Sequence, residues 1–303
     1  MPDPTSPATQ TSEDTQPAGD GWRPDLGALR ARLDEIDDTI HDLLMDRALV
    51  IEGVARSGKT AAFRPGREAS ILRRLLGRHT GRLPARTLVR MWREMLAGTT
   101  AMQSPVTLAV FDPTPDGAVN AIAREHFGFL TPAVTHPTIE ATLNAARTGA
   151  ATVAVLPFPL EDATWRALIQ TASDQNGSRQ KGLRQNEPHQ NGPRQNGPRL
   201  YVIARLPFWA GRPCDVPAAD AVVIATTAPD ASGETSGADR TFLALSQTPD
   251  RARLADAGLT LHATHGPIAE IEGMVSQNDP RLTPLGFVTV LGGYAVPVAG
   301  DNA

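Results

Sequence analysis

The chain has 303 residues, a single cysteine and a formal net charge of −4 at pH 7. One cysteine excludes an internal disulfide framework and a cysteine-based zinc site, and no apolar run is long enough to span a bilayer. The first 20 residues lack the basic start and the apolar core of a secretory signal, so we expect a cytoplasmic protein.

The charge is unevenly distributed along the chain. Residues 22–103 carry 15 basic and 10 acidic side chains, whereas residues 104–303 carry 14 basic and 19 acidic ones. We therefore expect an anionic ligand in the first of these regions. Nucleic acid and a small polycarboxylate would both fit.

Composition and periodicity divide the chain into three parts. Residues 1–22 are rich in Pro, Thr, Ser and Asp, which is typical of a disordered tail. Residues 23–104 have helical periodicity. Residues 105–303 alternate short apolar runs with helical stretches, which predicts an α/β domain. Within it, residues 175–199 repeat a Gln-Asn unit with almost no apolar residue, so we predict a disordered surface insertion.

The first predicted helix covers residues 26–55. Its apolar residues recur at steps of three and four and form one face, at Leu29, Leu33, Ile36, Ile40, Leu43, Val50 and Val54. Arg47 occupies the position where the next apolar residue of this series is expected. A buried guanidinium is costly unless an anion meets it. That anion is either an internal carboxylate or a ligand.

Two shorter helices are predicted after this one. The second begins at about Arg67, and the third covers residues 85–103. The predicted faces are Glu68, Ile71, Leu72 and Leu75 in the second helix and Leu88, Trp92, Met95, Thr99 and Met102 in the third. Each face is apolar apart from one polar residue, Glu68 or Thr99. Either residue alone is more often a satisfied core polar group, but together with Arg47 they predict a polar pocket inside a helical bundle.

The α/β part is predicted from its short apolar runs. Expected strands are residues 106–111, 151–156, 200–206, 221–226, 241–246 and 286–296, and expected helices lie near 117–127, 138–148, 161–172 and 267–275.

Residues 53–60 read GVARSGKT, a full match to the phosphate-binding loop pattern GxxxxGK[ST]. Such a loop needs a strand before it and a helix after it, and neither is predicted here. Asp112 could act as the associated magnesium ligand. A nucleotide-binding protein is therefore kept as an alternative. His262 and His265 have HxxH spacing but no third ligand nearby, so we expect no metal and no cofactor.

The helical residues resemble the all-helical class of chorismate mutases. The resemblance covers roughly residues 26–103, with LRxxxDxIDxxIxxLLxxR and PxREAxILxRL as its most specific parts. It implies a three-helix fold and conversion of chorismate to prephenate by a pericyclic rearrangement. Fixed cations and hydrogen-bond donors aimed at the charge of the transition state would suit that reaction, and holding the substrate compact would add to their effect.

The resemblance also implies a role for each site residue. Arg30 and Arg47 would bind the two carboxylates, and Lys59 and Gln103 would donate to the ether oxygen. Glu68 would take the ring hydroxyl, helped by backbone near Arg64, while Arg67 and Thr99 complete the pocket. Counted from Arg47, the family lysine falls at Gly58, one residue before Lys59. One residue turns a helix by about 100°.

An intertwined homodimer follows from the spacing of two of these residues. Arg30 and Arg47 are 17 residues apart on one predicted helix, about 26 Å at 1.5 Å per residue. Chorismate is too small to bridge that distance, so both can touch one ligand only from different chains. Two-fold symmetry would then give two shared sites.

The second region resembles prephenate dehydratase, on VTLAVFDP, the helix end EHFG, residues 147–157 and Arg240-Thr241-Phe242. Its marker elements are altered, because DPTP replaces the glycine-rich opening and the Thr-Arg-Phe order is scrambled. We expect a degenerate relative with a structural or regulatory role.

The second alternative is a non-enzymatic helical module that binds an anion or nucleic acid through a solvent-facing row of arginines. The candidates are Arg73, Arg74, Arg78, Arg82, Arg86, Arg90 and Arg93. Such a module would not need Arg47 inside an apolar seam, which favours the enzyme. We expect no nucleic-acid partner and no membrane partner.

Overall fold

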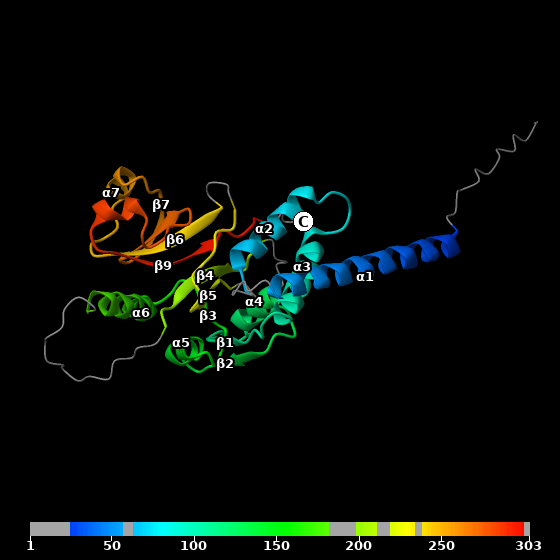
Figure 1. Cartoon of the computed structure of the whole chain (residues 1–303), viewed down its shortest axis with the longest axis horizontal. Coiled ribbons are helices and arrows are strands. Elements are labelled where there is room, and N and C mark those ends of the chain that lie inside the picture. Colours follow the sequence, from blue (N-terminus) through cyan, green and yellow to red (C-terminus); the bar gives the residue numbers. More distant parts are fainter. Residues whose placement is uncertain (1–24, 57–62, 182–197, 211–218, 234–237, 300–303) are drawn as a thin grey trace, which may run out of the picture. The chain divides into compact units, whose positions relative to one another are not determined.

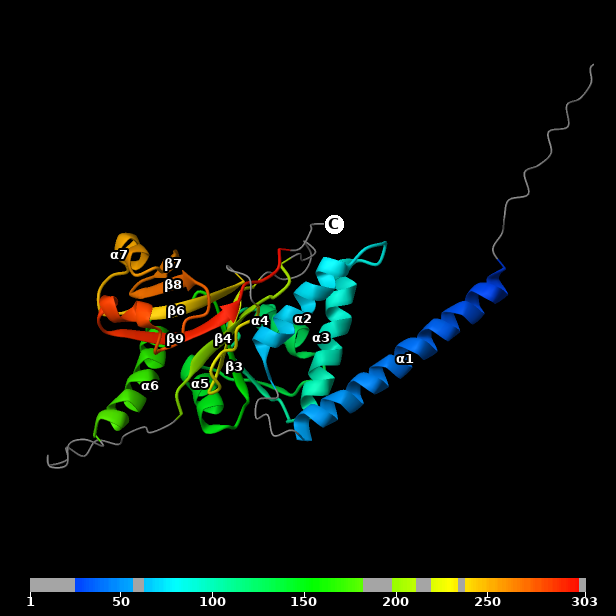
Figure 2. The same cartoon turned by 45° about the horizontal axis from the view of Figure 1, so that its top comes forward.

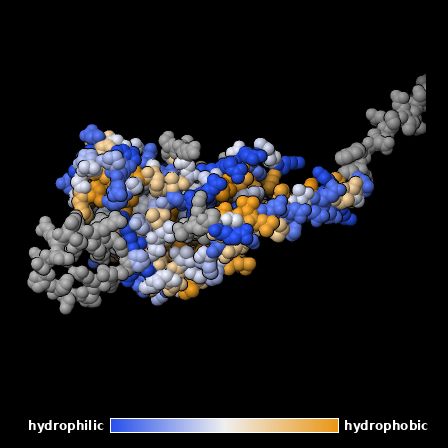
Figure 3. Space-filling view, viewed as in Figure 1, coloured by the Kyte–Doolittle hydropathy of each residue, from blue (hydrophilic) through white to orange (hydrophobic). Residues whose placement is uncertain are grey.

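The computed structural model describes residues 25–56, 63–181, 198–210, 219–233 and 238–299. The chain divides into two compact units, residues 1–50 and 51–303. Helix α1, Leu26–Arg56, is one continuous helix of 31 residues, as the apolar periodicity predicted. None of its residues is buried, and its apolar face, from Leu29 to Val54, is exposed. Hydrophobic and hydrophilic residues lie side by side on the surface of this helix in Figure 3. An apolar face of this length ordinarily packs on a partner.

Helices α2, Pro65–Arg78, and α3, Ala85–Ala101, pack against each other within the second unit. Helix α2 begins two residues earlier than predicted, because proline at the first helical position lacks only an N–H that would have no partner there. Helix α3 ends two residues before the predicted end.

The remainder of the second unit is built on a mixed sheet (Figure 1). Its described strands lie in the order β2-β1-β3-β5-β4-β9-β6-β8-β7. Their bounds are β1 Leu108–Val110, β2 Ala133–Thr135, β3 Val153–Pro157, β4 Tyr201–Leu206, β5 Ala221–Ala225, β6 Asp239–Leu245, β7 Leu261–His265, β8 Ile268–Glu272 and β9 Val288–Ala295. Strand β1 is parallel to β2 and β3, and antiparallel pairs follow from β3 to β5 and from β9 through β6 and β8 to β7.

Helices cover both faces of this sheet. Their bounds are α4 Ala118–Phe127, α5 Ile139–Thr148, α6 Asp162–Lys181, α7 Arg251–Asp256 and the 3-10 helix η1 Pro280–Leu285. Along β3, Val153 and Val155 pack with α4, while Ala154 and Leu156 pack with α5 and α6. Alternate residues of a strand point to opposite faces, so α4 covers one face and α5 and α6 the other (Figure 2). A further core joins α7 and η1 to β6, β8 and β9.

The α/β prediction is confirmed, but β2, β7 and α7 were not predicted, and two predicted segments need correction. Residues 267–275 were predicted to be helical, but β8 occupies residues 268–272 and pairs with β7 through a tight turn. Gly266 in that turn has φ of 60°, which glycine adopts without strain. Because β8 is buried on both faces, it lacks the alternation that identifies a strand in sequence. Helix α6 extends to Lys181, so the predicted insertion at 175–199 begins as helix, and residues 182–197 lie outside the described part.

Among the described helices, none combines the length and the apolar character needed to cross a membrane.

Candidate active site and its surroundings

Glu68 and Arg93 form a buried ion pair between α2 and α3. Arg93 Nη1 donates to Glu68 Oε2 across 2.8 Å, and the two side chains are 4% and 12% exposed. Burial raises the pKa of Glu68 to about 6, against the opposing charge of Arg93 and with help from the negative charge of Asp230. The carboxyl group that the sequence assigned to the substrate's ring hydroxyl thus has an internal cation beside it.

Arg93 was expected on a solvent-facing row, and that expectation is wrong. The buried face of α3 consists of Val89, Arg93, Leu96, Thr99 and Thr100. It lies next to the predicted stripe of Leu88, Trp92 and Met95, whose members are only half-buried. A helix face defined by steps of three and four can be misplaced by one residue when one of its members is charged.

Arg73 also does not belong to the proposed nucleic-acid-binding row, because its guanidinium has partners within the protein. Its guanidinium donates to Ser232 Oγ, to the carbonyl oxygen of Ala238 at 2.8 Å and to that of Val296 at 2.6 Å. Arg73 therefore connects α2 by hydrogen bonds to the loops next to β6 and β9. The remaining arginines of the row, Arg74, Arg78, Arg82, Arg86 and Arg90, are exposed.

Asp230 caps the start of α2 from the loop after β5. It accepts hydrogen bonds from the backbone N–H groups of Gly66 at 2.9 Å and Arg67 at 3.2 Å, and its Oδ2 lies 3.3 Å from Arg64 Nε. A carboxylate at a helix N-terminus satisfies unpaired N–H groups and complements the helix dipole. A Cβ on Gly66 would lie 2.2 Å from the carbonyl oxygen of Asp230, so this approach requires glycine.

Thr99 and Gln103 lie at the C-terminal end of α3. The Thr99 hydroxyl donates to the carbonyl oxygen of Met95 at 2.9 Å, and Gln103 Nε2 donates to that of Thr99 at 3.3 Å. The Thr99 hydroxyl is therefore satisfied within its own helix. The structure brings Glu68 together with Arg93.

Arg30 and Arg47 lie on one continuous helix, α1, as predicted. Arg30 is exposed, whereas Arg47 is half-buried, and this partial burial lowers its pKa. Lys59 lies outside the described residues, so its position is not defined.

The phosphate-loop pattern does not have the structural context it needs. Gly53 to Arg56 continue helix α1, and the rest of the pattern lies outside the described residues. Asp112, considered as a magnesium ligand, accepts hydrogen bonds from Thr114 and Asn120 at the entrance to α4. Burial would raise the pKa of Asp112, but these hydrogen bonds outweigh it and lower the pKa.

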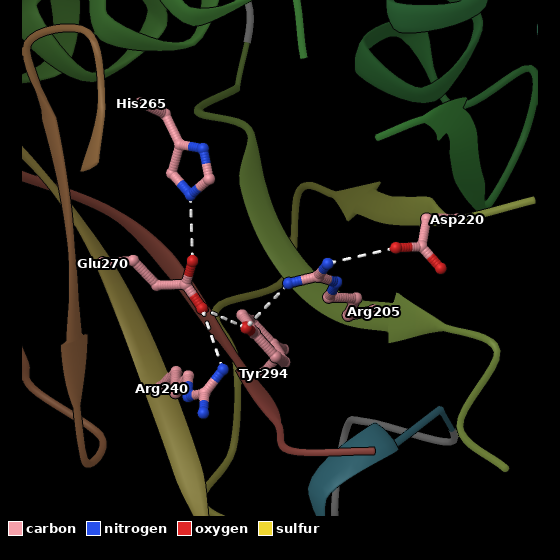
Figure 4. Close-up of polar contacts among 6 residues, drawn as sticks. All are labelled: Arg205, Asp220, Arg240, His265, Glu270 and Tyr294. Carbon is pink, nitrogen blue, oxygen red and sulfur yellow. Dashed lines mark hydrogen bonds and ion pairs between the residues drawn. The ribbon is translucent and has the colours of Figure 1, made fainter. Parts of the chain in front are cut away.

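A second polar cluster lies across β4 and β6–β9 (Figure 4). Glu270, which is 1% exposed, accepts from Tyr294 and His265 and pairs with Arg240. Arg205 donates to the Tyr294 hydroxyl at 3.4 Å and pairs with Asp220. Burial alone would raise the pKa of Glu270. The hydrogen bonds from His265 and Tyr294, with the charges of Arg205 and Arg240, instead lower it to about 2.

His265, one member of the HxxH pair, therefore binds a carboxylate. Within the described part of the chain, no three His, Cys, Asp or Glu residues lie close enough together to hold a metal ion. Asp230 and Glu270 were not predicted as polar groups of interest, and Arg93 was predicted only as an exposed residue. Asp230 is 164 residues from Gly66, and no motif linked Arg93 to Glu68.

The helical region described above is similar to a known protein family. Residues 29–104 match the protein-family model described as chorismate mutase type II. This confirms the resemblance that the residues of all three helices predicted.

Curated relatives extend the similarity beyond the helices. A bifunctional chorismate mutase/prephenate dehydratase of Stutzerimonas stutzeri is 31% identical over 156 residues, which is 48% of this chain and 41% of that protein. The protein of the same name from Neisseria gonorrhoeae is 32% identical over 129 residues, 42% of this chain and 35% of that protein. The matched stretch thus spans about two fifths or less of these relatives.

Solved prephenate dehydratases are also similar in structure. The enzyme from Streptococcus mutans has 16% identity and a TM-score of 0.36 over 64% of this chain and 100% of that chain. A complex with L-Phe from Arthrobacter aurescens has 14% identity and a TM-score of 0.37 over 65% of this chain and 92% of that chain.

Proposed function

We propose that the protein is a chorismate mutase that converts chorismate to prephenate. The observation that carries the proposal is the match of residues 29–104 to the type II family model, together with the charged residues of the three helices. The nucleotide-binding alternative is weakened because α1 continues to Arg56. The nucleic-acid alternative is weakened because Arg73 and Arg93 have internal partners.

The proposed chemistry needs no nucleophile and no proton transfer. Arg30 and Arg47 would neutralise the two substrate carboxylates. Lys59 and Gln103 would donate to the ether oxygen, where negative charge gathers in the transition state. Preorganised donors in a dry site stabilise that charge without having to reorient during the reaction.

Glu68, helped by backbone near Arg64, would bind the ring hydroxyl of the substrate, and Arg67 and Thr99 would complete the pocket. The ionised Glu68 would accept a hydrogen bond from that hydroxyl while Arg93 holds the carboxylate on its other side. Asp230 would fix the backbone of Arg64 and Arg67 by capping α2. The α/β region would thus help to position Arg64 and Arg67 of the mutase site through Asp230.

The proposed assembly is an intertwined homodimer in which each site draws on both chains. The apolar face of α1 is exposed along its full length in a single chain, which supports a helix partner. Antiparallel pairing of two α1 helices would bring Arg30 of one chain near Arg47 of the other. We place the enzyme in the cytoplasm, in keeping with its biosynthetic relatives.

The proposed domains are a tail at 1–22, a mutase domain at 23–104 and a dehydratase-like domain at 105–303. The last would lack dehydratase activity because its marker residues are altered.

Paired substitutions on α1 test the proposal. Arg47→Ala should lower kcat/KM for chorismate by roughly 100-fold or more, since removing one partner of a buried charged contact costs about 3–5 kcal/mol. Arg32→Ala is the matched control, because Arg32 is exposed on the same helix and pairs with Glu35. Equal activity of both variants would refute the assignment of Arg47.

A further inference from the structure

The loop after β5 is held between helix α2 and strand β6. On the side of α2, Asp230 accepts hydrogen bonds from the backbone N–H groups of Gly66 at 2.9 Å and Arg67 at 3.2 Å. The loop backbone also lies directly against the helix, because a Cβ on Gly66 would lie 2.2 Å from the carbonyl oxygen of Asp230 and 2.7 Å from that of Ala231. A side chain at this position would therefore push the loop away from α2.

On the side of β6, the buried carboxylate of Asp239 holds the next part of the same loop. Its two oxygens accept hydrogen bonds from the backbone N–H of Ser232 at 3.1 Å and 3.0 Å, and one of them also accepts from the Ser232 hydroxyl. Asp239 and Ser232 are 5% and 2% exposed. Hydrogen bonds to an ionised acceptor are roughly twice as strong as those between neutral groups. Asp239 thus fixes the backbone two residues after Asp230.

Arg73 connects this pair to α2. Its guanidinium donates to the Ser232 hydroxyl oxygen and to the carbonyl oxygens of Ala238 and Val296. Burial lowers the pKa of Arg73, and the charge of Asp239 opposes that change. The loop is therefore joined to α2 at the start of the helix and again about two turns later.

These contacts reach Glu68 through Asp230. Burial raises the pKa of Glu68, the charge of Arg93 on α3 lowers it, and the charge of Asp230 raises it further. The charge of Asp239 acts on Arg73 instead. An influence of Asp239 on the ionisation of Glu68 must therefore pass through the position of Asp230.

Two further titratable groups near Glu68 belong to other elements. Glu94 on α3 and His126 on α4 line the same cavity as Glu68. Burial, together with the charge of Arg93, holds the pKa of His126 well below its ordinary value, so its imidazole is neutral. Of the charged groups around Glu68, Asp230 is the one that the loop carries.

We propose that Asp239 is a positioning residue for Glu68: it holds Ser232 and thereby keeps the carboxylate of Asp230 at the start of α2. Asp239 itself would touch neither the substrate nor the reacting atoms. Its effect on catalysis rests on the proposed function, in which Glu68 binds the ring hydroxyl. Its effect on the ionisation of Glu68 does not depend on mutase activity.

The titration of Glu68 in the full-length protein tests this inference. Its side-chain carboxyl carbon is followed by NMR from about pH 4 to 8 in protein that contains ¹³C-labelled glutamate, and Glu68→Gln assigns the signal. In Asp239→Asn the amide keeps one oxygen for Ser232 but loses the charge and the second acceptor. This variant should lower the Glu68 midpoint by at least about 0.3 pH unit, a twofold change in the acid dissociation constant. An unchanged midpoint in the folded variant would overturn the proposal.

A double-substitution cycle separates positioning from general loosening of the fold. In Asp230→Asn the charge that Asp239 is proposed to position is already gone, so adding Asp239→Asn should shift the Glu68 midpoint no further. A further shift of the same size in that background would contradict the proposal, because Asp239 would then act by another route. If Asp239→Asn does not fold, Ser232→Ala decides, since it removes the hydroxyl between Asp239 and Arg73. It should lower the midpoint in the same direction, and an unchanged midpoint in it would refute the proposal.

Asp279→Asn is the matched control. Asp279 caps the start of η1 and pairs with Arg281, so its loss disturbs a helix start elsewhere and should leave the Glu68 midpoint in place. Chorismate turnover is measured on the same samples, and its pH midpoint should move with the NMR midpoint in Asp239→Asn. If the wild type does not convert chorismate but Asp239→Asn still shifts the NMR midpoint, the proposed function fails and the positioning of Asp230 stands.

Discussion

Arg93 Nη1 lies 2.8 Å from Glu68 Oε2, and this buried contact joins the two helices that carry most of the proposed site. Glu68 is the carboxylate assigned to the substrate, and Arg93 is its internal counter-ion. The pair therefore links packing of α2 on α3 to the charge of the site. Its removal is expected to change both stability and activity.

Arg93→Ala should destabilise the protein by about 3–5 kcal/mol at pH 7.5, because it leaves a buried carboxylate without its cation. Arg90→Ala, at an exposed position on the same helix, should change stability by about 0.5 kcal/mol or less. Urea unfolding followed by far-UV circular dichroism measures both. Similar midpoints for the two variants would contradict the role of the pair.

The raised pKa of Glu68, about 6, predicts a pH profile. Only the ionised carboxylate is a full acceptor for the ring hydroxyl, so kcat/KM for chorismate should fall about tenfold per pH unit below pH 6. Glu68→Gln should be slower at neutral pH and should lose this dependence. A wild-type profile that is flat from pH 5 to 8 would count against Glu68 as the acceptor.

The same pKa affects stability with a definite sign. The folded-state pKa of Glu68 lies above the unfolded value, so the native protein binds more protons between about pH 4.5 and 6. The contribution of Glu68 to the free energy of unfolding is fully present below about pH 4.5. It falls by about 2 kcal/mol as pH rises through this window.

Asp230→Asn should move the Glu68 profile to lower pH. The negative charge of Asp230 helps to raise the pKa of Glu68, and the amide removes that charge while keeping an oxygen for the start of α2. Asp220→Asn, which disrupts the pair with Arg205 instead, should leave the profile in place. The midpoint of the pH–rate curve measures the difference, and no shift in Asp230→Asn would rule out this coupling.

The Glu270 cluster predicts the opposite response to acid. The pKa of Glu270, about 2, lies below the value in the unfolded chain. The contribution of Glu270 to the free energy of unfolding is therefore present above about pH 4.5 and is lost as pH falls toward 2. Glu270→Gln should remove up to about 3 kcal/mol of stability at pH 7 and flatten the pH dependence of unfolding in this range. Chemical unfolding at pH 3, 4, 5 and 7 tests this. If the free energy of unfolding depends on pH in the same way for variant and wild type, Glu270 does not cause the loss of stability in acid.

Shared sites predict complementation between inactive chains. Arg30→Ala and Arg47→Ala should each be nearly inactive. When they are unfolded together and refolded, a mixed dimer should regain one site that holds both intact arginines. Activity of the mixture and the yield of mixed dimers are measured together. Mixed dimers without activity would disprove sharing.

Local pattern was enough to predict much of the fold. The steps of three and four predicted the limits of α1 to within a few residues. Short apolar runs predicted β1, β3, β4, β5, β6 and β9, whereas β2 and β7 were not predicted. Strand β8 was missed because burial on both faces removes the alternation. The face of α3 was misplaced because Arg93 reads as a surface residue until its partner is known.

Long-range pairing accounts for what the sequence did not reveal about the site. Glu68 was identified from the residues around it, but Arg93 is 25 residues away, and Asp230 comes from the loop after β5. These contacts join residues whose separation in the sequence follows no helix or strand period, so one sequence alone does not predict them. The roles of Arg30, Arg47, Lys59 and Gln103 stay predictions.

Direct observation of product tests the central claim most directly. The purified full-length protein, with a chelator and without added nucleotide, is incubated with chorismate, and prephenate is followed by its acid-catalysed conversion to phenylpyruvate. The account predicts prephenate formation far above the uncatalysed rate, undiminished by the chelator, and phenylpyruvate only after acidification. Prephenate formation no faster than in buffer alone, or activity abolished by the chelator, would contradict it.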